Sequence, residues 1–159
     1  MATRTADLPC SFMGVPTPFS VKVTSAETWY KGSLIYQLAA GGCTKTWAAS
    51  LPFIGISPHG QTIAAGGEGL IFMGPFVWKV PDTTAGLAVT DEGDDMGAIA
   101  AGDNWLDVVK YTTGTGANTA SMIGRLLRFV SVTEVYVAIK DPAFYCVAKA
   151  AATATLFTP

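Results

Sequence analysis

The chain has 159 residues and a formal net charge of −2, with 50% hydrophobic but only 14% charged residues. This length suits one domain, since domains most often hold about 100–150 residues. The slight acidity argues against nucleic-acid binding, which needs a basic surface. The apolar runs are broken well short of the roughly 20 residues that a membrane-spanning helix requires. We therefore expect no nucleic acid and no membrane as partners.

The charged fraction of 14% lies well below the typical value of about 25%. Alanine, glycine, threonine and apolar side chains must then cover much of the surface. Large exposed apolar patches are uncommon on soluble monomers. We therefore expect the chain to bury much of its outside against other chains, as a homo-oligomer.

Residues 1–18 are predicted to form an extended N-terminal arm, because prolines block both helix and ladder hydrogen bonds. Isolated apolar side chains stand along this arm, and Leu8, Phe12 and Val15 are expected to be interface anchors. The segment contains no continuous apolar region of the kind that drives export. A β-rich domain over residues 19–148 and a tail over residues 149–159 complete the predicted organisation.

Short strands are predicted along the first half of the domain. Residues 19–23 alternate with period two, which is typical of a half-buried strand. Further strand-like runs end at turns rich in glycine and proline, and they cover residues 33–38, 53–57, 70–73 and 76–80.

The second half continues this pattern after a predicted loop over residues 82–98. Residues 103–111 read as a strand and residues 112–119 as a turn or loop. The stretch 121–130 fits helical spacing in part, but its glycine and the β-branched run after it favour a strand. Residues 133–140 alternate most regularly. Many short strands separated by turns predict an all-β or mainly β fold, a compact barrel or sandwich with extended arms.

Glycines punctuate the apolar runs in two ways. The phrase Ile63–Gly66 recurs as Ile99–Gly102, and each copy combines a small-residue turn with an acidic residue and a strand-like run. Gly55 and Gly124 instead stand alone inside apolar runs. A lone glycine in such a run predicts a bulge or a close backbone approach.

The C-terminal stretch is rich in alanine, and residues 148–152 suit a short helix or a last strand equally well. Leu156 and Phe157 lie at the very end of the chain, where disorder is the usual expectation. Two large apolar side chains at this place predict a tail that is tied down on this subunit or on a neighbour.

Residues that could carry catalysis are few. His59, the one histidine, lies in a predicted turn without the nucleophile and orienting group that a base needs. Cys10, Cys43 and Cys146 have no metal or disulfide spacing, which suits a reducing cytoplasm, and Cys146 is expected to be buried and inert. We predict no catalytic residue, no cofactor and no enzyme activity.

Two further groups of residues could form ligand sites. The acidic residues 91–95 provide oxygen ligands for calcium, but they do not match the spaced calcium-loop pattern, so we expect a solvated loop and no metal site. The aromatic residues could form a sugar-stacking face, although aromatics in antiparallel sheets more often belong to a core or an interface. They include Trp29, Tyr30, Trp47, Trp78 and Trp105.

The order of these pieces resembles a family of tailed-phage capsid decoration proteins, also called structural cement or head-stabilising proteins. The resemblance covers roughly residues 31–141. It rests on Lys31-Gly32-Ser33-Leu34, Ile54-Gly55-Ile56, Ile63-Ala64-Ala65-Gly66-Gly67, Val80-Pro81, Ile99-Ala100-Ala101-Gly102-Asp103, Ile123-Gly124-Arg125 and Val135-Tyr136-Val137. The chain differs from the family pattern in the arm of residues 1–20, in an insertion over residues 42–51 and in the tail after Asp141.

The resemblance implies a non-enzymatic virion protein on the outer capsid surface that cements neighbouring subunits of the major capsid protein. It also implies a homo-oligomer, with a trimer favoured, and assembly in the host cytoplasm. Trp47 of the insertion, together with Leu8, Phe12, Val15, Leu156 and Phe157, is the predicted interface. A head-fibre or adhesion module that binds host glycans, a small carbohydrate-active enzyme and a major capsid protein are the alternative readings.

Overall fold

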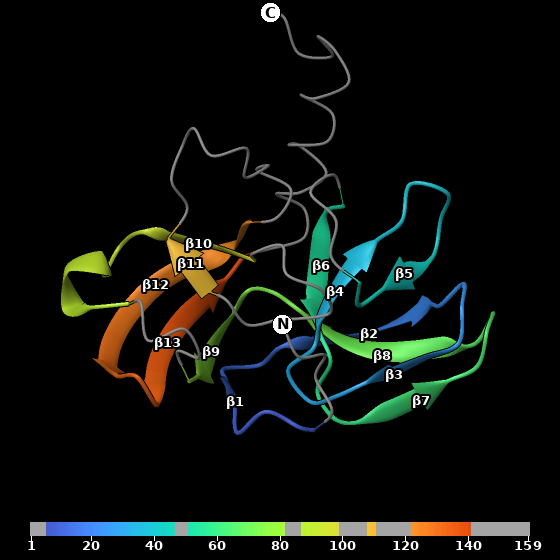
Figure 1. Ribbon diagram of the computed structural model, residues 1–159, viewed down its shortest axis with the longest axis horizontal. Coiled ribbons are helices and arrows are strands. Elements are labelled where there is room, and N and C mark those ends of the chain that lie inside the picture. Colours follow the sequence, from blue (N-terminus) through green and yellow to red (C-terminus); the bar gives the residue numbers. More distant parts are fainter. Residues whose placement is uncertain (1–5, 47–50, 82–86, 99–107, 111–121, 141–159) are drawn as a thin grey trace, which may run out of the picture.

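The structure, a computed structural model, describes residues 6–46, 51–81, 87–98, 108–110 and 122–140, and these are mainly β (Figure 1). The mainly β prediction is therefore confirmed. These described residues form one 3₁₀ turn, η1 (Val89–Asp91), and thirteen strands: β1 Ser11–Met13, β2 Thr17–Lys22, β3 Glu27–Trp29, β4 Leu34–Gln37, β5 Cys43–Thr44, β6 Phe53–Ile56, β7 Gln61–Ile63, β8 Glu68–Met73, β9 Phe76–Val80, β10 Asp95–Ala98, β11 Val108–Lys110, β12 Met122–Ser131 and β13 Glu134–Ile139.

The strands form three antiparallel sheets. A six-stranded sheet has the order β1-β9-β13-β12-β10-β11, a five-stranded sheet has the order β2-β8-β6-β4-β5, and β3 and β7 form a two-stranded ribbon. Of the two predicted architectures, barrel and sandwich, the arrangement is sandwich-like, and the sheets do not close into a barrel. Figure 1 shows the six-stranded sheet on one side and the other two sheets on the opposite side.

Two hydrophobic cores hold the sheets together. The larger core contains Trp78 and Val137 from the six-stranded sheet and Tyr36 and Phe53 from the five-stranded sheet, all almost fully buried. It therefore lies between these two sheets. Burying side chains of this size stabilises the fold by about 1.5–3 kcal/mol each.

The smaller core lies on the other face of the five-stranded sheet, where Ile35 and Ile71 pack with Trp29 and Ile63 of the two-stranded ribbon. Side chains alternate across a strand, so β4 sends Leu34 and Tyr36 into the larger core and Ile35 into the smaller one. The run Leu34–Tyr36 is apolar throughout because both faces of β4 are covered.

Glu27 joins the two-stranded ribbon to β5. Its carboxylate accepts hydrogen bonds from the Trp29 indole N–H at 2.7 Å, from the Thr44 hydroxyl and from the Lys45 backbone N–H at 2.9 Å. Lys45 in turn donates from Nζ to the Thr28 carbonyl at 2.9 Å. Charge-assisted bonds of this kind are stronger than neutral ones, so the network fixes the position of the ribbon.

The lone glycines lie where backbones approach closely, as predicted. A Cβ on Gly55 would stand 2.6 Å from the Phe72 carbonyl oxygen, and a Cβ on Gly124 would collide with the Ala138 carbonyl. Gly66 turns the chain between β7 and β8 with a φ of +76°, a conformation that favours glycine. The matching phrase Ile99–Gly102 lies outside the described residues.

The predicted strands over residues 19–23, 33–38, 53–57, 70–73, 76–80 and 133–140 correspond to β2, β4, β6, β8, β9 and β13. The ambiguous stretch 121–130 is strand β12 in its described residues. The predicted loop over residues 82–98 is wrong in part, because Asp95–Ala98 forms β10 against β12. The short strands β1, β3, β5 and β7 were not predicted.

The predicted boundary at residue 18 needs a correction. β1 pairs with β9, β2 begins at Thr17, and Leu8 and Cys10 are buried in the larger core. Residues 6–18 are therefore an integral part of the β domain. The prolines that suggested an arm are compatible with this arrangement, because β2 is an edge strand, where proline is tolerated. The tail over residues 149–159, the helix or strand over residues 148–152 and the loop over residues 112–119 lie outside the described residues.

Candidate interaction surface

A corner where the chain crosses between the two larger sheets carries three exposed apolar side chains, including that of Val15, which is the most exposed large apolar side chain of the described residues. β1 pairs with β9 in the six-stranded sheet, while β2 pairs with β8 in the five-stranded sheet. Two connections therefore cross side by side from one sheet to the other, residues 14–16 between β1 and β2 and the cis peptide Gly74–Pro75 between β8 and β9. We call Met13, Val15 and Phe19 on this crossing the corner ribbon.

The three corner-ribbon side chains have exposed fractions of 47%, 92% and 52% in chain order. No charged residue occurs between Asp7 and Lys22, and the neighbouring Glu68 carboxylate accepts a hydrogen bond from the Ser20 hydroxyl at 2.8 Å. Pro16 and Pro18 provide no backbone N–H, which hinders the addition of a further strand at this edge. The ribbon therefore presents side chains rather than a free edge for strand pairing.

The predicted interface residues differ in how far they are buried. Val15 is fully exposed, whereas Leu8 is 6% exposed and lies in the core of its own chain, so it is not a surface anchor. Phe12 is half-buried, with its ring edge-on to Phe72 at 5.1 Å and to Phe76 at 5.7 Å between centroids. Trp47, Leu156 and Phe157 lie outside the described residues.

Phe19 was missed as a surface residue. Phe19 begins an alternating run in which Val21 and Val23 are buried, and period two alone placed it with them. The signal for its exposure was the lack of charge combined with two nearby prolines, which marks an edge strand that other chains can cover.

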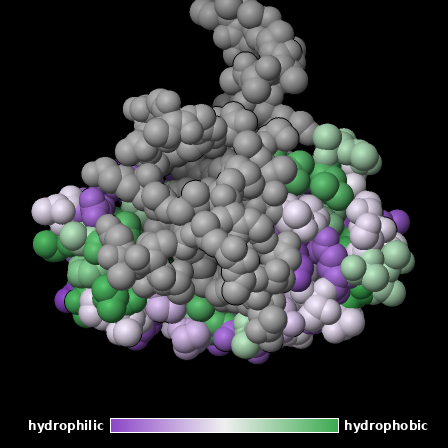
Figure 2. Space-filling model, viewed as in Figure 1, coloured by the Kyte–Doolittle hydropathy of each residue, from purple (hydrophilic) through white to green (hydrophobic). Residues whose placement is uncertain are grey.

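A second set of exposed apolar side chains lies along β12 and η1. Two register shifts in the β12–β13 pairing leave Leu127 and Val130 as extra residues, each 48% exposed. Bulged residues are left unpaired and bend the strand. Val132 in the following turn and Val89 in η1 are also exposed. Figure 2 shows that hydrophobic residues at this end of the molecule, left in the view, lie among hydrophilic ones.

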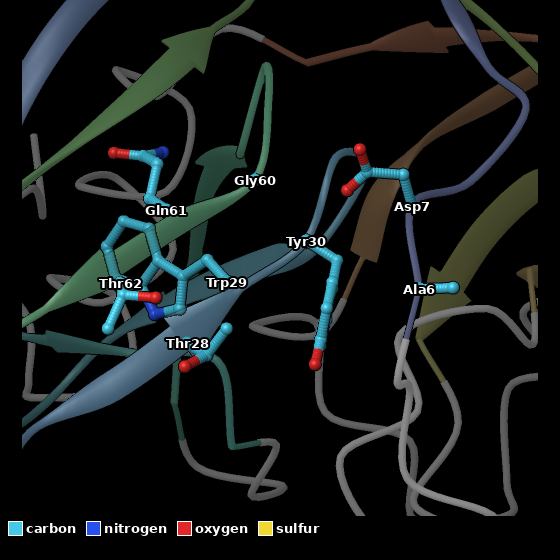
Figure 3. Close-up of a pocket in the computed structure, with 8 residues that line it drawn as sticks. All are labelled: Ala6, Asp7, Thr28, Trp29, Tyr30, Gly60, Gln61 and Thr62. Atoms are coloured by element: carbon cyan, nitrogen blue, oxygen red, sulfur yellow. The ribbon is translucent and has the colours of Figure 1, made fainter.

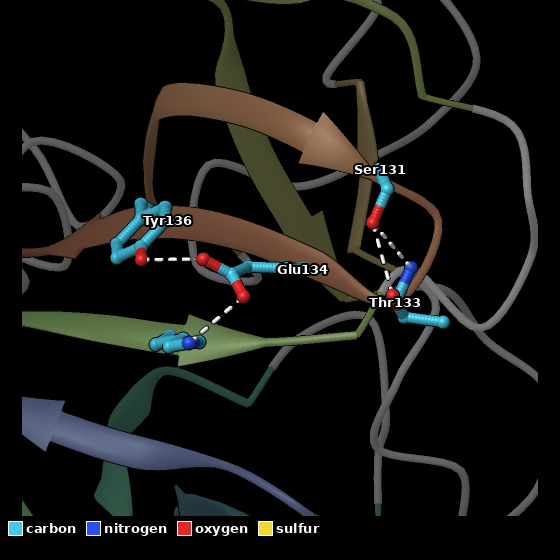
Figure 4. Close-up of polar contacts among 5 residues, drawn as sticks. Ser131, Thr133, Glu134 and Tyr136 are labelled. Atoms are coloured by element: carbon cyan, nitrogen blue, oxygen red, sulfur yellow. Dashed lines mark hydrogen bonds and ion pairs between the residues drawn. The ribbon is translucent and has the colours of Figure 1, made fainter.

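The outer face of the six-stranded sheet holds a partly exposed polar cluster (Figure 4). Glu134 accepts a bond from Tyr136 at 2.6 Å and pairs with Lys79 Nζ at 2.8 Å, and this ammonium lies 5.9 Å from the Tyr136 ring centroid. The hydrogen bond with Glu134 raises the pKa of Lys79, and the bonds from Lys79 and Tyr136 lower the pKa of Glu134. Exposed pairs of this kind contribute little stability.

The acidic residues 91–95 take part in local structure. Asp91 accepts the Ala88 backbone N–H at 2.8 Å, Glu92 accepts the Phe129 N–H at 2.8 Å, and Asp95 pairs with Arg125 at 3.2 Å. The contacts of Glu92 and Asp95 attach η1 and β10 to β12. The described residues contain no group of three or more His, Cys, Asp or Glu side chains that could hold a metal ion.

The candidate catalytic residues are scattered. His59 is exposed in the turn between β6 and β7, and its backbone carbonyl accepts a hydrogen bond from the Ser57 hydroxyl at 2.8 Å. Cys10 and Cys43 are both buried. Trp29 and Trp78 are core residues and provide no sugar-stacking face. Cys146 and Trp105 lie outside the described residues.

The thiol of Cys43 is expected to be inert in the folded protein. Burial, with a smaller contribution from nearby Glu27, raises its pKa from 9.0 to about 11. Because the thiolate is the reactive form, iodoacetamide at pH 8 should label Cys43 far more slowly in the native protein than in urea. Site-resolved mass spectrometry measures both rates, and equal rates would contradict the buried position.

The same shift has a consequence for stability. The folded state keeps the Cys43 proton to a higher pH than the unfolded state does. The stability that the folded protein gains from the protonated thiol is therefore fully present below pH 9. It is lost as the pH rises from 9 towards 11.

Comparison with protein-family models, with curated proteins and with solved structures finds no match to this chain. Within the described part of the chain, no helical segment has the length and hydropathy of a membrane span.

Proposed function

We propose that the protein is a non-enzymatic structural subunit of a tailed-phage virion. In this proposal it binds the outer surface of the capsid and cements neighbouring subunits of the major capsid protein, after assembly in the host cytoplasm. The corner ribbon is the observation that carries the proposal. It presents three apolar side chains, Met13, Val15 and Phe19, on a stretch without charge.

The way in which the fold holds the corner ribbon in place supports a role in attachment. β1 and β2 are paired with β9 and β8 along their lengths, and Phe12 packs beneath them against Phe72 and Phe76. Such a surface is ordered before it binds, so little conformational entropy is lost on docking. Burying an apolar side chain contributes about 1.5–3 kcal/mol.

Several copies strengthen this attachment. The low charge of the chain and its resemblance to decoration proteins support a homo-oligomer, with a trimer as our proposal. A trimer carries three corner ribbons, and these raise the overall affinity for the capsid without stronger individual contacts, provided that all three reach the capsid together. Analytical ultracentrifugation of the purified protein measures the oligomeric state on which this avidity depends.

Co-sedimentation with expanded phage heads that lack this protein tests the proposal. The wild type should bind these heads and raise their resistance to heat and low salt. A Val15→Asp/Phe19→Asp variant should lose most binding while keeping its fold, because both side chains are exposed and a charge placed in an apolar contact must be desolvated.

Leu127→Asp provides the matched control, since Leu127 is similarly exposed but lies on β12 of the six-stranded sheet. It should bind as the wild type does. Failure of the wild type to bind any head that lacks it, or unchanged binding by the Val15→Asp/Phe19→Asp variant, would count against the proposal.

A further inference from the structure

A groove of about 360 Å³ opens on the five-stranded side of the molecule, between the segment of Ala6 and Asp7 and the β3–β7 ribbon. In Figure 3, Tyr30 lies between Asp7 on one side and Trp29, Thr28 and Thr62 on the other. The volume falls at the lower end of the range of roughly 300–1,000 Å³ typical of small-molecule sites.

Hydrogen bonds fix both walls of this groove. The Lys31 backbone N–H donates to Asp7 Oδ1 at 2.8 Å, and the Leu8 N–H donates to the Lys31 carbonyl at 3.1 Å. The Tyr30 N–H donates to the Ser33 hydroxyl at 3.0 Å. The Lys45 ammonium lies 5.8 Å from the Tyr30 ring centroid while it donates to the Thr28 carbonyl. The groove is therefore preorganised.

Two of the lining residues are fully engaged in the fold. The Gln61 side chain donates to the Ser57 hydroxyl and to the Leu70 carbonyl and accepts the Leu70 N–H, each at 2.7 Å. The Trp29 indole N–H is bound to Glu27. These side chains form rigid walls and have no remaining donor for a ligand in that arrangement.

Other polar groups at the groove have no partner among the described residues. They are Asp7 Oδ2 and the hydroxyls of Thr28, Tyr30 and Thr62. Thr28 and Thr62 are directly opposite each other in the β3–β7 register, so their side chains point to the same face of the β3–β7 ribbon. The groove thus combines an aromatic ring, a carboxylate oxygen and a pair of neighbouring hydroxyls.

The charge of the lining narrows the ligand class. Among the described residues the groove is lined by one carboxylate and by no lysine or arginine, and the nearby Lys45 ammonium donates to the Thr28 carbonyl. This lining disfavours phosphate and other anions. A neutral polyhydroxyl ligand fits better, since its hydroxyls can donate to Asp7 and exchange bonds with the threonines, while its C–H groups pack on the Tyr30 ring. We propose that this groove binds a saccharide through Tyr30, Asp7 and the Thr28–Thr62 pair.

Titration of the full chain by NMR tests this inference, with glucose, galactose, N-acetylglucosamine, lactose, maltotriose and chitotriose as probes. At least one sugar should bind and shift resonances of the groove residues. Tyr30→Ala should weaken that binding about tenfold or more through the lost ring contact. Asp7→Asn keeps an acceptor for the Lys31 N–H, so a loss of affinity in this variant reports the missing charge.

Tyr136→Ala is the control, because Tyr136 is a partly exposed tyrosine on the outer face of the six-stranded sheet. Its affinity should equal that of the wild type. Binding of none of the six sugars, equal affinity of Tyr30→Ala and the wild type, or binding only of an amine such as methylamine would overturn the inference. The groove and the corner ribbon share no residue, so capsid co-sedimentation of Tyr30→Ala should be unchanged and the two proposals can fail separately.

Discussion

A variant that lacks residues 1–13 is expected to lose the cooperative fold. It removes Leu8 and Cys10 from the larger core and Phe12 from its packing against Phe72 and Phe76. It also exposes the edge of β9, which β1 covers. Each buried side chain of this size is worth about 1.5–3 kcal/mol, and the loss of several approaches the total of about 5–15 kcal/mol that stabilises a domain. Circular dichroism with thermal and urea melting measures the result.

Two point variants in the same stretch of sequence test whether burial decides the effect of a substitution on stability. Leu8→Ala should destabilise by about 2–5 kcal/mol, as deletion of buried methyl groups does. Val15→Ala should change stability by less than about 0.5 kcal/mol, because Val15 is almost fully exposed. A truncated chain that melts with wild-type cooperativity would show that residues 6–13 are dispensable, contrary to the packing seen here.

Gly124→Ala is expected to destabilise the six-stranded sheet. Gly124 lies opposite Ile139 in the β12–β13 pairing, and a Cβ at this position would collide with the Ala138 carbonyl. Both strands must then shift, although Ile123 and Leu126 on β12 are fully buried. Overpacking of this kind costs about 1–3 kcal/mol or more, which corresponds to a fall in Tm of about 2–12 °C.

Gly60→Ala is the matched control, because a Cβ on Gly60 would meet no atom closer than 3.4 Å. Its Tm should stay within about 2 °C of the wild type. Equal melting of the Gly124→Ala variant and the wild type would mean that the β12–β13 backbones can separate without cost.

The sequence pattern located the strands in which apolar and polar residues alternate, and those in which the residues are apolar throughout. β13 is the clearest example, since Val135, Val137 and Ile139 face the core and their neighbours do not. β3, β5 and β7 have only two or three residues each, too few for a period to be seen. These strands exist because Glu27, Trp29 and Ile63 meet residues distant in the sequence.

The candidate sites were less predictable than the strands. Tyr30 and Asp7 are 23 positions apart in the sequence, and no motif joins them. They approach one another because Asp7 accepts the Lys31 N–H, a contact between a proline-containing segment and a turn. Lone aromatic and acidic residues are common in loops, so only their position in space distinguishes these two.

The sequence by itself determined the mainly β class, the main strands and the positions where only glycine fits, because each depends on local periodicity or on the size of one side chain. The tertiary structure alone decided which apolar residues near the N-terminus face outward. Leu8 and Val15 occur in the same proline-rich stretch, yet Leu8 is buried and Val15 is exposed. Burial depends on what packs against a residue from distant parts of the chain: Leu8 belongs to the core formed with β4, β6, β9, β12 and β13, whereas Val15 lies at the outside of the crossing between two sheets.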